Sequence, residues 1–276
     1  VLPKPGRDLV LSIDRRIQYL AYRELKAAVF EHGARAGSAV VLDARSGEVL
    51  ALVNEPDFNP NNRAGLRSGL FRNRAVTDLF EPGSTIKPFT IATALESGKY
   101  SPGSVIDTTP GVLRVGDRTF RDVHDYGVLT VAGVIGKSSN VGMSKIALAL
   151  NKKSMWEMLR QAGFGQTTGV RLPGEVAGLL NPYSKWVPVD QASIAFGYGI
   201  SVTPLQLARA YLALANDGTA LPLTLQHAET VPQGERIMSA KIARQLQTML
   251  ELAVSDTGTV RAAQVADYRV AGKTGT

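Results

Sequence analysis

Apolar residues recur at helical spacing in several segments of the chain. In the first segment Asp14 is a candidate N-cap, and the apolar stripe that follows it consists of Ile17, Leu20, Leu25 and Val29. This pattern predicts a helix that ends at about His32. The same periodicity predicts helices over residues 84–97, 204–216 and 239–254, and a helical zone over 130–162 that is interrupted around 136–140.

Two short apolar runs nearer the N-terminus predict a β-hairpin. They cover residues 38–42 and 48–53, and the Asp-Ala-Arg-Ser-Gly segment at 43–47 between them is typical of a hairpin connection. Residues 54–74 are polar, which predicts a loop that leads to the helix at 84.

The order of the elements predicts the class of fold. A final strand is predicted to start at Tyr268, after a long and mostly helical insertion. We expect an α/β (α+β) fold whose N- and C-terminal strands meet in one antiparallel sheet, flanked by helices and beside a helical subdomain. Residues 1–276 then form a single domain, with a sheet subdomain over 1–70 and 236–276 and a helical subdomain over 71–235.

The composition is that of a globular protein. Of the 276 residues 44% are hydrophobic and 20% are charged, which suffices for one large domain or two closely packed subdomains. No apolar run is long enough to cross a bilayer, and the polar N-terminal segment has no signal-peptide pattern. We therefore expect any membrane anchor to lie upstream of this chain.

The residue counts exclude several kinds of chemistry. Cysteine is absent, which excludes disulfides, thiolate metal sites and cysteine nucleophiles. His32, His124 and His227 lie far apart, so we expect neither a metal site nor a serine–histidine triad. The net charge of +7 comes from dispersed Lys and Arg residues, and we expect no nucleic-acid partner.

One segment, Glu-Pro-Gly-Ser-Thr-Ile-Lys-Pro at 81–88, places a hydroxyl and an amine one helical turn apart. Pro88 has no N–H to donate to the carbonyl of Ser84, so a helix is not expected to begin before Ser84. The hydroxyl then lies at the positive end of the helix, which stabilises a developing oxyanion. Because residues three apart share a face, Lys87 can reach the oxygen of Ser84 and, when neutral, accept its proton. A helix cap followed by a surface lysine is the alternative.

Two further polar motifs follow. Ser138-Ser139-Asn140 lies between predicted helical stretches, where a turn can aim the Ser138 hydroxyl and the Asn140 amide inward. Residues 273–276, Lys-Thr-Gly-Thr, lie on the predicted final strand, whose alternation places Lys273 and Gly275 on one face. The ordered set of three motifs favours a catalytic site over three separate structural roles.

These motifs resemble those of the penicillin-recognising serine acyltransferases, which include penicillin-binding proteins and serine β-lactamases. Further segments are similar to class B penicillin-binding proteins, and most of all to the division-specific peptidoglycan D,D-transpeptidase: residues 8–14, 39–43, 47–51, 80–89, 168–175 and 197–204. The resemblance runs essentially from Asp8 to Thr276.

The resemblance implies a serine acyl-enzyme mechanism. Ser84 would attack the carbonyl between the two terminal D-alanines of a peptidoglycan stem peptide, and a β-lactam would acylate it in the same way. Lys87 would be the base, with its pKa lowered by burial and by a second cation, for which Lys273 is the candidate. Ser138 would relay a proton to the leaving D-alanine, and an amine of a neighbouring stem peptide would resolve the acyl-enzyme.

The same resemblance implies the substrate contacts. The backbone N–H groups of Ser84 and Thr276 would form the oxyanion hole. Asn140 would hold the substrate backbone, and Lys273, Thr274 and Thr276 would hold the terminal carboxylate of the substrate. The substrate-binding candidates are Asn140, Lys273, Thr274, Gly275, Thr276, Val123 and Tyr198. Asp122 and His124 flank Val123 in a loop expected near the cleft, and His124 is expected to be structural.

Three other functions remain open as alternatives. A D,D-carboxypeptidase would use water as the acceptor in place of an amine. A serine β-lactamase would need a carboxylate to activate water; Glu175 is a candidate, but its Leu-Pro-Gly-Glu segment is similar to class B penicillin-binding proteins. The third alternative is a catalytically incomplete penicillin-binding fragment or sensor.

The family pattern also sets expectations about the surroundings of this chain. We expect C-terminal strands and a helix to be missing after Thr276, which would leave the last strand as an exposed edge. The resemblance implies a place on the periplasmic face of the bacterial inner membrane. It implies peptidoglycan stem peptides and β-lactams as ligands, a glycan polymerase and divisome proteins as partners, and no cofactor.

Overall fold

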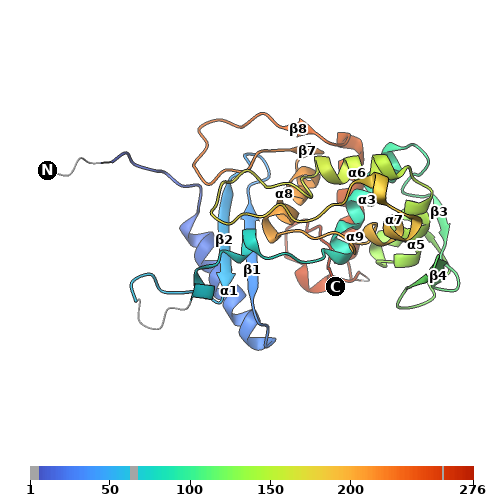
Figure 1. Cartoon of the computed structure of the whole chain (residues 1–276), viewed down its shortest axis with the longest axis horizontal. Coiled ribbons are helices and arrows are strands. Elements are labelled where there is room, and N and C mark those ends of the chain that lie inside the picture. The colour runs from blue at the N-terminus through green and yellow to red at the C-terminus, as the bar shows by residue number, and fades with distance from the viewer. Residues whose placement is uncertain (1–5, 63–67, 257) are drawn as a thin grey trace.

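The computed structural model describes residues 6–62, 68–256 and 258–276. The N-terminal elements lie at one side of the molecule and the helices and small hairpins of residues 74–215 extend to the other (Figure 1). In the described residues, the named strands pair in antiparallel two-stranded sheets. No described helix combines the length and the apolar character required to cross a membrane.

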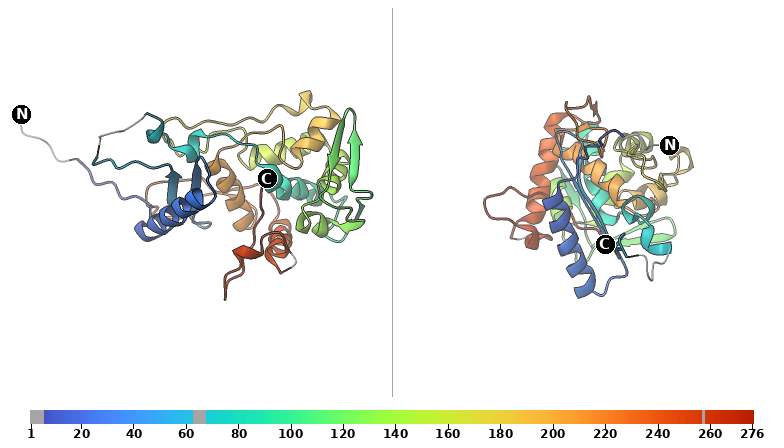
Figure 2. Two further views of the ribbon diagram at one scale, coloured as in Figure 1. Left: turned by 90° about the horizontal axis from the view of Figure 1, so that it is seen from below. Right: turned by 90° about the vertical axis from the view of Figure 1, so that its left-hand side faces the viewer.

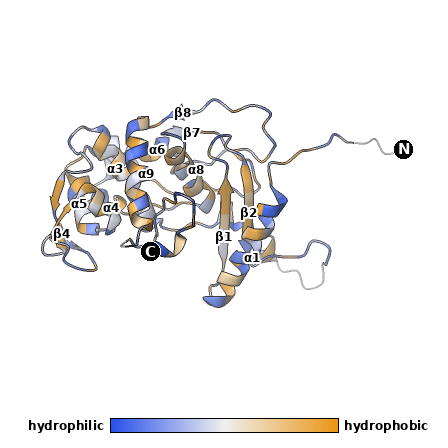
Figure 3. Ribbon diagram, turned by 180° about the vertical axis from the view of Figure 1, so that it is seen from behind, coloured by the Kyte–Doolittle hydropathy of each residue, from blue (hydrophilic) through white to orange (hydrophobic). Residues whose placement is uncertain are grey.

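Helix α1 (Arg15–Glu31) packs against the hairpin of β1 (Gly37–Leu42) and β2 (Val49–Glu55). Asp14 caps α1 by accepting hydrogen bonds from the N–H groups of Arg16 and Ile17, which confirms the predicted start of this helix. The inward residues of β2 alternate with partly exposed ones, and both strands are largely hydrophobic (Figure 3). The predicted hairpin is therefore confirmed, with slightly wider bounds.

The predicted loop over 54–74 is only partly confirmed. Residues 63–67 of this segment lie outside the described residues. On either side the chain is more regular than predicted, since 54–55 belong to β2 and a 3₁₀ turn covers Ser68–Phe71. The short helix α2 (Arg74–Thr77) follows.

The helix predicted over 84–97 consists of two parts, a 3₁₀ turn over Gly83–Ile86 and α3 over Lys87–Glu96. Pro88 explains this difference, because it has no N–H for the carbonyl of Ser84. The N–H of Lys87 donates to that carbonyl instead, in the tighter i+3 pattern. Residues 87–95 of α3 are all buried, as expected for a central helix.

The other helices and strands lie further along the chain. The helices are α4 (Val131–Gly136), α5 (Asn140–Leu148), α6 (Lys152–Gln161), α7 (Pro188–Ile194), α8 (Pro204–Ala215) and α9 (Ala240–Val254). Of these, α4, α5, α6 and α9 contact α3. The short strands are β3 (Val105–Asp107), β4 (Val112–Val115), β5 (Arg118–Arg121), β6 (Val128–Thr130), β7 (Thr219–Ala220) and β8 (Glu235–Arg236). A 3₁₀ turn covers Tyr183–Lys185 and another covers Arg261–Ala263. The predicted helical zone over 130–162 thus contains three helices, and its interruption lies between α4 and α5.

The largest hydrophobic cluster surrounds Phe89 on α3. The Phe89 ring makes edge-to-face contacts with Phe164, at 5.4 Å between centroids, and with Tyr211 on α8, at 5.8 Å. A second, smaller cluster on the other side of α8 contains Leu205 and Leu212 and packs against the β1–β2 hairpin. Helix α8 therefore joins the hairpin to the helical part of the fold.

The strand predicted to start at Tyr268 is absent: residues 268–276 form no strand in the described structure. The expected meeting of N- and C-terminal strands in one sheet is therefore wrong for the described residues. The N–H of Gly272 donates to the carbonyl of Leu250 on α9, and the backbone of Thr276 lies against Gly83. This segment therefore makes a backbone hydrogen bond to a helix and packs against a turn, and does not pair with a strand. Figure 2 shows its end near the centre of the molecule.

Candidate active site

Ser84 and Lys87 lie on the 3₁₀ turn and at the first residue of α3. The side chain of Lys87 is fully buried, and its Nζ donates to the carbonyl of Ser138 at 2.6 Å, to the Oγ of Ser138 at 3.1 Å and to the Oδ1 of Asn140 at 2.9 Å. The Oγ of Ser138 in turn donates to the Oγ of Ser84 at 3.1 Å. The amine thus connects to Ser84 through Ser138, which differs from the expected direct contact.

The turn between α4 and α5 carries Ser138 in a left-handed conformation, with φ at 56°. This region favours glycine, and a serine is held there only when its surroundings fix it. Two backbone hydrogen bonds do so, from Ser138 N–H to Ile135 and from Ser139 N–H to Val134. Ser139 then caps α5 by accepting from the N–H of Gly142 at 2.8 Å.

Asn140 is oriented by the end of β5. Its Nδ2 donates to the carbonyl of Arg121 at 3.2 Å, which leaves Oδ1 directed at Lys87. Next to Arg121, the carboxylate of Asp122 accepts from the Oγ of Ser139 at 2.6 Å, from the N–H of Asn140 and from the N–H of Val141. Sequence reasoning placed Asp122 near the cleft but gave it no role, because no motif spacing links it to Ser138.

The electrostatics of the site favour a neutral lysine. The pKa of Lys87 is lowered to about 7, mainly by burial and in addition by the nearby charge of Lys273, while the charge of Asp122 opposes both effects. Burial also lowers the pKa of Lys273 to about 8. Near neutral pH a large fraction of Lys87 is therefore unprotonated and able to accept a proton.

The C-terminal residues approach Ser84 from the side of the preceding glycine. A Cβ built on Gly83 would lie 2.5 Å from the carbonyl oxygen of Thr276, and one built on Gly275 would lie 2.9 Å from that of Pro82. The hydroxyl of Tyr198 donates to the Thr276 carbonyl at 3.1 Å. The structure thus brings Thr276, Gly275 and Tyr198 to the turn that carries Ser84.

The remaining candidates are less enclosed. Lys273 is partly buried and its Nζ donates to the carbonyl of Thr274 at 3.2 Å, while the Thr274 residue is exposed. Val123 follows Asp122 and is 83% exposed. The ring of His124 stacks edge-to-face on Tyr126 at 6.0 Å.

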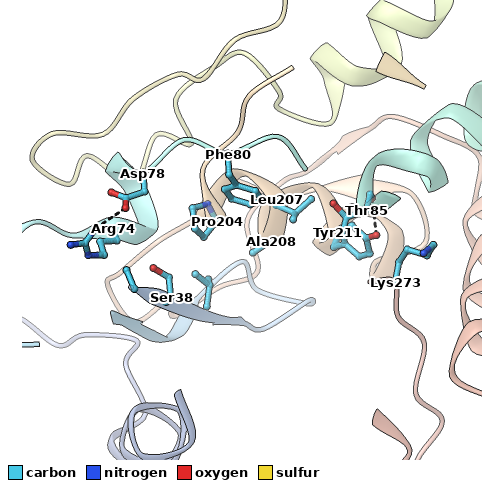
Figure 4. A pocket seen from close by; sticks show the side chains of 13 residues that line it. Ser38, Arg74, Asp78, Phe80, Thr85, Pro204, Leu207, Ala208, Tyr211 and Lys273 are labelled. Atoms are coloured by element: carbon cyan, nitrogen blue, oxygen red, sulfur yellow. Dashed lines mark hydrogen bonds and ion pairs between the residues drawn. The ribbon is translucent and has the colours of Figure 1, made fainter. Parts of the chain in front are cut away.

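A groove of about 560 Å³ adjoins the site on the side of α8. Figure 4 shows Lys273 at one end of it and the ion pair of Arg74 and Asp78 at the other. Between them, the hydroxyl of Tyr211 donates to the carbonyl of Thr85 at 2.8 Å. This hydrogen bond fastens the turn that carries Ser84 to α8.

Glu175, the candidate for water activation, is engaged elsewhere. Its Oε1 accepts from the N–H of Thr168 at 2.6 Å and from the hydroxyl of the same residue. Its neighbour Val176 donates to the carbonyl of Val76 on α2 at 3.1 Å. These contacts hold a loop against α2, and neither hydrogen bond of the carboxylate reaches Ser84 or Lys87.

Comparison with known proteins agrees with this fold. Residues 37–276 match the family model of the penicillin-binding protein transpeptidase domain. The chain resembles the transpeptidase domain of penicillin-binding protein 3 from Burkholderia pseudomallei, with a TM-score of 0.89 and 43% identity over 99% of this chain and 78% of that one. The chain therefore belongs to the penicillin-binding transpeptidase family, and the mixed α/β fold class is confirmed.

Two curated relatives carry the same designation. The chain is 44% identical over 275 residues to the probable peptidoglycan D,D-transpeptidase PenA of Neisseria flavescens, covering all of this chain and 68% of that protein. It is 43% identical over 272 residues to the peptidoglycan D,D-transpeptidase FtsI of Escherichia coli K12, covering 98% of this chain. The chain spans 46% of the length of that second relative, so it corresponds to about half of it.

Proposed function

We propose that this chain carries the D,D-transpeptidase activity that cross-links peptidoglycan stem peptides, with Ser84 as the nucleophile. One observation carries the proposal: a buried lysine of lowered pKa is hydrogen-bonded through Ser138 to the hydroxyl of Ser84. A neutral amine connected to a serine in this way is a base for that serine. The names of the relatives support peptidoglycan as the substrate.

In the acylation step the proton of Ser84 passes through Ser138 to Lys87 as the Oγ attacks the carbonyl between the two D-alanines. The bond between Oγ and the carbonyl carbon forms, and the tetrahedral intermediate breaks the C–N bond to the terminal D-alanine. Ser138 delivers the proton to that leaving nitrogen. Acylation therefore consumes no net proton, and Lys87 is neutral again at its end.

The substrate is held on both sides of Ser84. The backbone N–H groups of Ser84 and Thr276 stabilise the oxyanion, and Asn140 binds the peptide backbone. Lys273, with the hydroxyls of Thr274 and Thr276, binds the terminal carboxylate. Gly275 allows the substrate backbone to approach closely, and Val123 and Tyr198 line the cleft. The proximity of Thr276 to Gly83, the residue before Ser84, supports this assignment.

An amine of a second stem peptide then attacks the acyl-enzyme. Its C–N bond forms as the ester bond to Ser84 breaks, and its proton returns to Ser84 through Lys87. A β-lactam acylates Ser84 in the same way, but its ring-opened product stays attached and blocks the second step.

This substrate places the activity at the periplasmic face of the bacterial inner membrane, where the relatives' substrate, peptidoglycan, is built. A glycan polymerase and divisome proteins are the corresponding partners, since cross-linking has to follow synthesis of the glycan strand.

Labelling with a fluorescent penicillin tests the proposal. We expect one stable adduct per chain by intact-mass measurement, and none in Ser84→Ala. With a stem-peptide donor, addition of an amine acceptor should yield cross-linked peptide. Continued release of D-alanine with no cross-linked peptide, even when the acceptor is present, would indicate a carboxypeptidase. Rapid hydrolysis of the penicillin would indicate a β-lactamase. Labelling of Ser84→Ala, or no labelling of the wild type, would overturn the role of Ser84.

A further inference from the structure

Asp122 connects the β4–β5 hairpin to the first turn of α5. It directly follows β5, which ends at Arg121, and its carboxylate accepts hydrogen bonds from the Oγ of Ser139 and the N–H groups of Asn140 and Val141. A carboxylate at this position satisfies backbone donors that have no partner within the helix and complements the positive end of the helix dipole.

These contacts fix the two residues on either side of Ser139. Asn140 makes two hydrogen bonds to residues at the end of β5. Its N–H donates to the carboxylate of Asp122, and its Nδ2 donates to the carbonyl of Arg121. Its Oδ1 is thereby turned toward Lys87, with which it forms a hydrogen bond of 2.9 Å. Ser138, which has a left-handed conformation, comes directly before Ser139, and the hydroxyl of Ser139 donates to the carboxylate of Asp122.

We propose that Asp122 is a positioning residue for acyl transfer: it holds the Ser138–Asn140 turn so that Ser138 and Asn140 both face Lys87, and it acts through Ser139 and Asn140 without touching the substrate. This inference rests on the proposed reaction at Ser84. A displaced turn would lengthen the path between Ser84 and Lys87, and misplacement by about 1 Å can slow an enzymatic step about 100-fold.

The charge of Asp122 has a second effect that a purely structural contact lacks. Lys87 is influenced by two charged groups, Lys273, which lowers its pKa, and Asp122, which raises it. Burial raises the pKa of Tyr126 in the same loop, and the charge of Asp122 raises it further. Removal of the charge should therefore lower the pKa of Lys87 and move the acid limb of the acylation profile to lower pH, even as the maximal rate falls.

The test compares Asp122→Asn with Asp125→Asn in the full-length protein. Asp125 is a matched control, because it lies in the same loop and its carboxylate accepts a hydrogen bond from the N–H of Gly127 at 2.9 Å. The second-order rate of acylation by a fluorescent penicillin is measured across the acid limb for each variant. We expect Asp122→Asn to be at least about 10-fold slower at its optimum, with its limb at lower pH, and Asp125→Asn to match the wild type.

Asp122→Glu separates charge from position and also decides the matter if the Asn variant does not fold. It keeps the negative charge on a longer side chain. We therefore expect its acid limb at the same pH as that of the wild type, together with a lower maximal rate of acylation. The proposal is overturned if Asp122→Asn reacts as fast as the wild type, or if Asp122→Glu reacts at the wild-type rate. Failure of the underlying reaction is distinguishable, because then the wild type itself would not be labelled at Ser84.

Discussion

The hydroxyl of Ser138 lies 3.1 Å from that of Ser84, although the two residues are 54 positions apart. Lys87 is only three positions from Ser84, yet its hydrogen bonds go to Ser138 and Asn140. Lys87 is fully buried, and its amine needs hydrogen-bond partners there, which the turn between α4 and α5 supplies. The hydrogen-bonded path between Lys87 and Ser84 therefore depends on a residue from another element.

The rate of acylation should depend on pH through Lys87. Burial lowers the pKa of this amine to about 7, so the reactive neutral form increases as the pH rises through 7. We expect the acylation rate to rise about 10-fold per pH unit well below 7 and to level off above it. Lys273→Ala should move this limb to higher pH, because Lys273 lowers the pKa of Lys87. A limb that does not move would contradict the charge coupling of the two lysines.

The same lysine should make stability depend on pH. In the unfolded chain the pKa of Lys87 returns to its usual 10.5, so between about 7 and 10.5 the unfolded state binds more protons than the folded state. Its burial thus destabilises the fold below pH 7, and this cost disappears as the pH rises toward 10.5. The free energy of unfolding of Lys87→Met, taken relative to that of the wild type, should therefore fall by up to about 1.4 kcal/mol per pH unit as the pH rises through that interval.

Urea unfolding at several pH values measures this trend. The exposed Lys99 lies just beyond the C-terminal end of α3, and Lys99→Met is the control for removing a lysine that is not buried. A pH-independent difference between Lys87→Met and the wild type would contradict the lowered pKa of Lys87.

Gly197 should be indispensable for the geometry of the nucleophile. Its φ is +95°, its carbonyl accepts from the N–H of Gly83 at 3.2 Å, and an added Cβ would lie 2.0 Å from the carbonyl oxygen of Gly83. Gly197→Ala should displace the turn that carries Ser84, slow acylation about 100-fold and destabilise the fold by about 2–4 kcal/mol.

Gly98 is a matched control for this substitution. It also has a positive φ, of +69°, but an added Cβ would meet no atom within 4 Å. Gly98→Ala should cost about 1–2 kcal/mol of stability and leave acylation unchanged. Equal acylation rates in the two variants, measured with a fluorescent penicillin, would show that the close approach to Gly83 is unimportant.

The core around Phe89 should contribute strongly to stability. Phe89 is fully buried between Phe164 and Tyr211, so Phe89→Ala should lower the free energy of unfolding by about 3–5 kcal/mol. Phe30→Ala should change it by less than about 0.5 kcal/mol, because Phe30 is 89% exposed. Chemical denaturation compares them, and a small loss in Phe89→Ala would indicate that the core closes around the cavity.

Local rules explain which elements could be predicted. Asp14 and Ser239 cap helices where the apolar periodicity begins, and Pro88 sets the pattern of hydrogen bonds around Ser84. These features depend on neighbours within about one helical turn. The strand predicted from Tyr268 failed because a strand depends on a distant partner, and the apolar residues alone do not show which partner is present.

The sequence by itself determined the longer helices, the hairpin and the three motifs that contain Ser84, Ser138 and Lys273, because periodicity, capping and spacing are properties of neighbouring residues. The tertiary structure alone decided that Lys87 connects to Ser84 through Ser138, and that Asp122 holds the turn between α4 and α5. Burial of Lys87 is likewise a result of packing, and it is this packing that lowers the pKa of the amine to about 7.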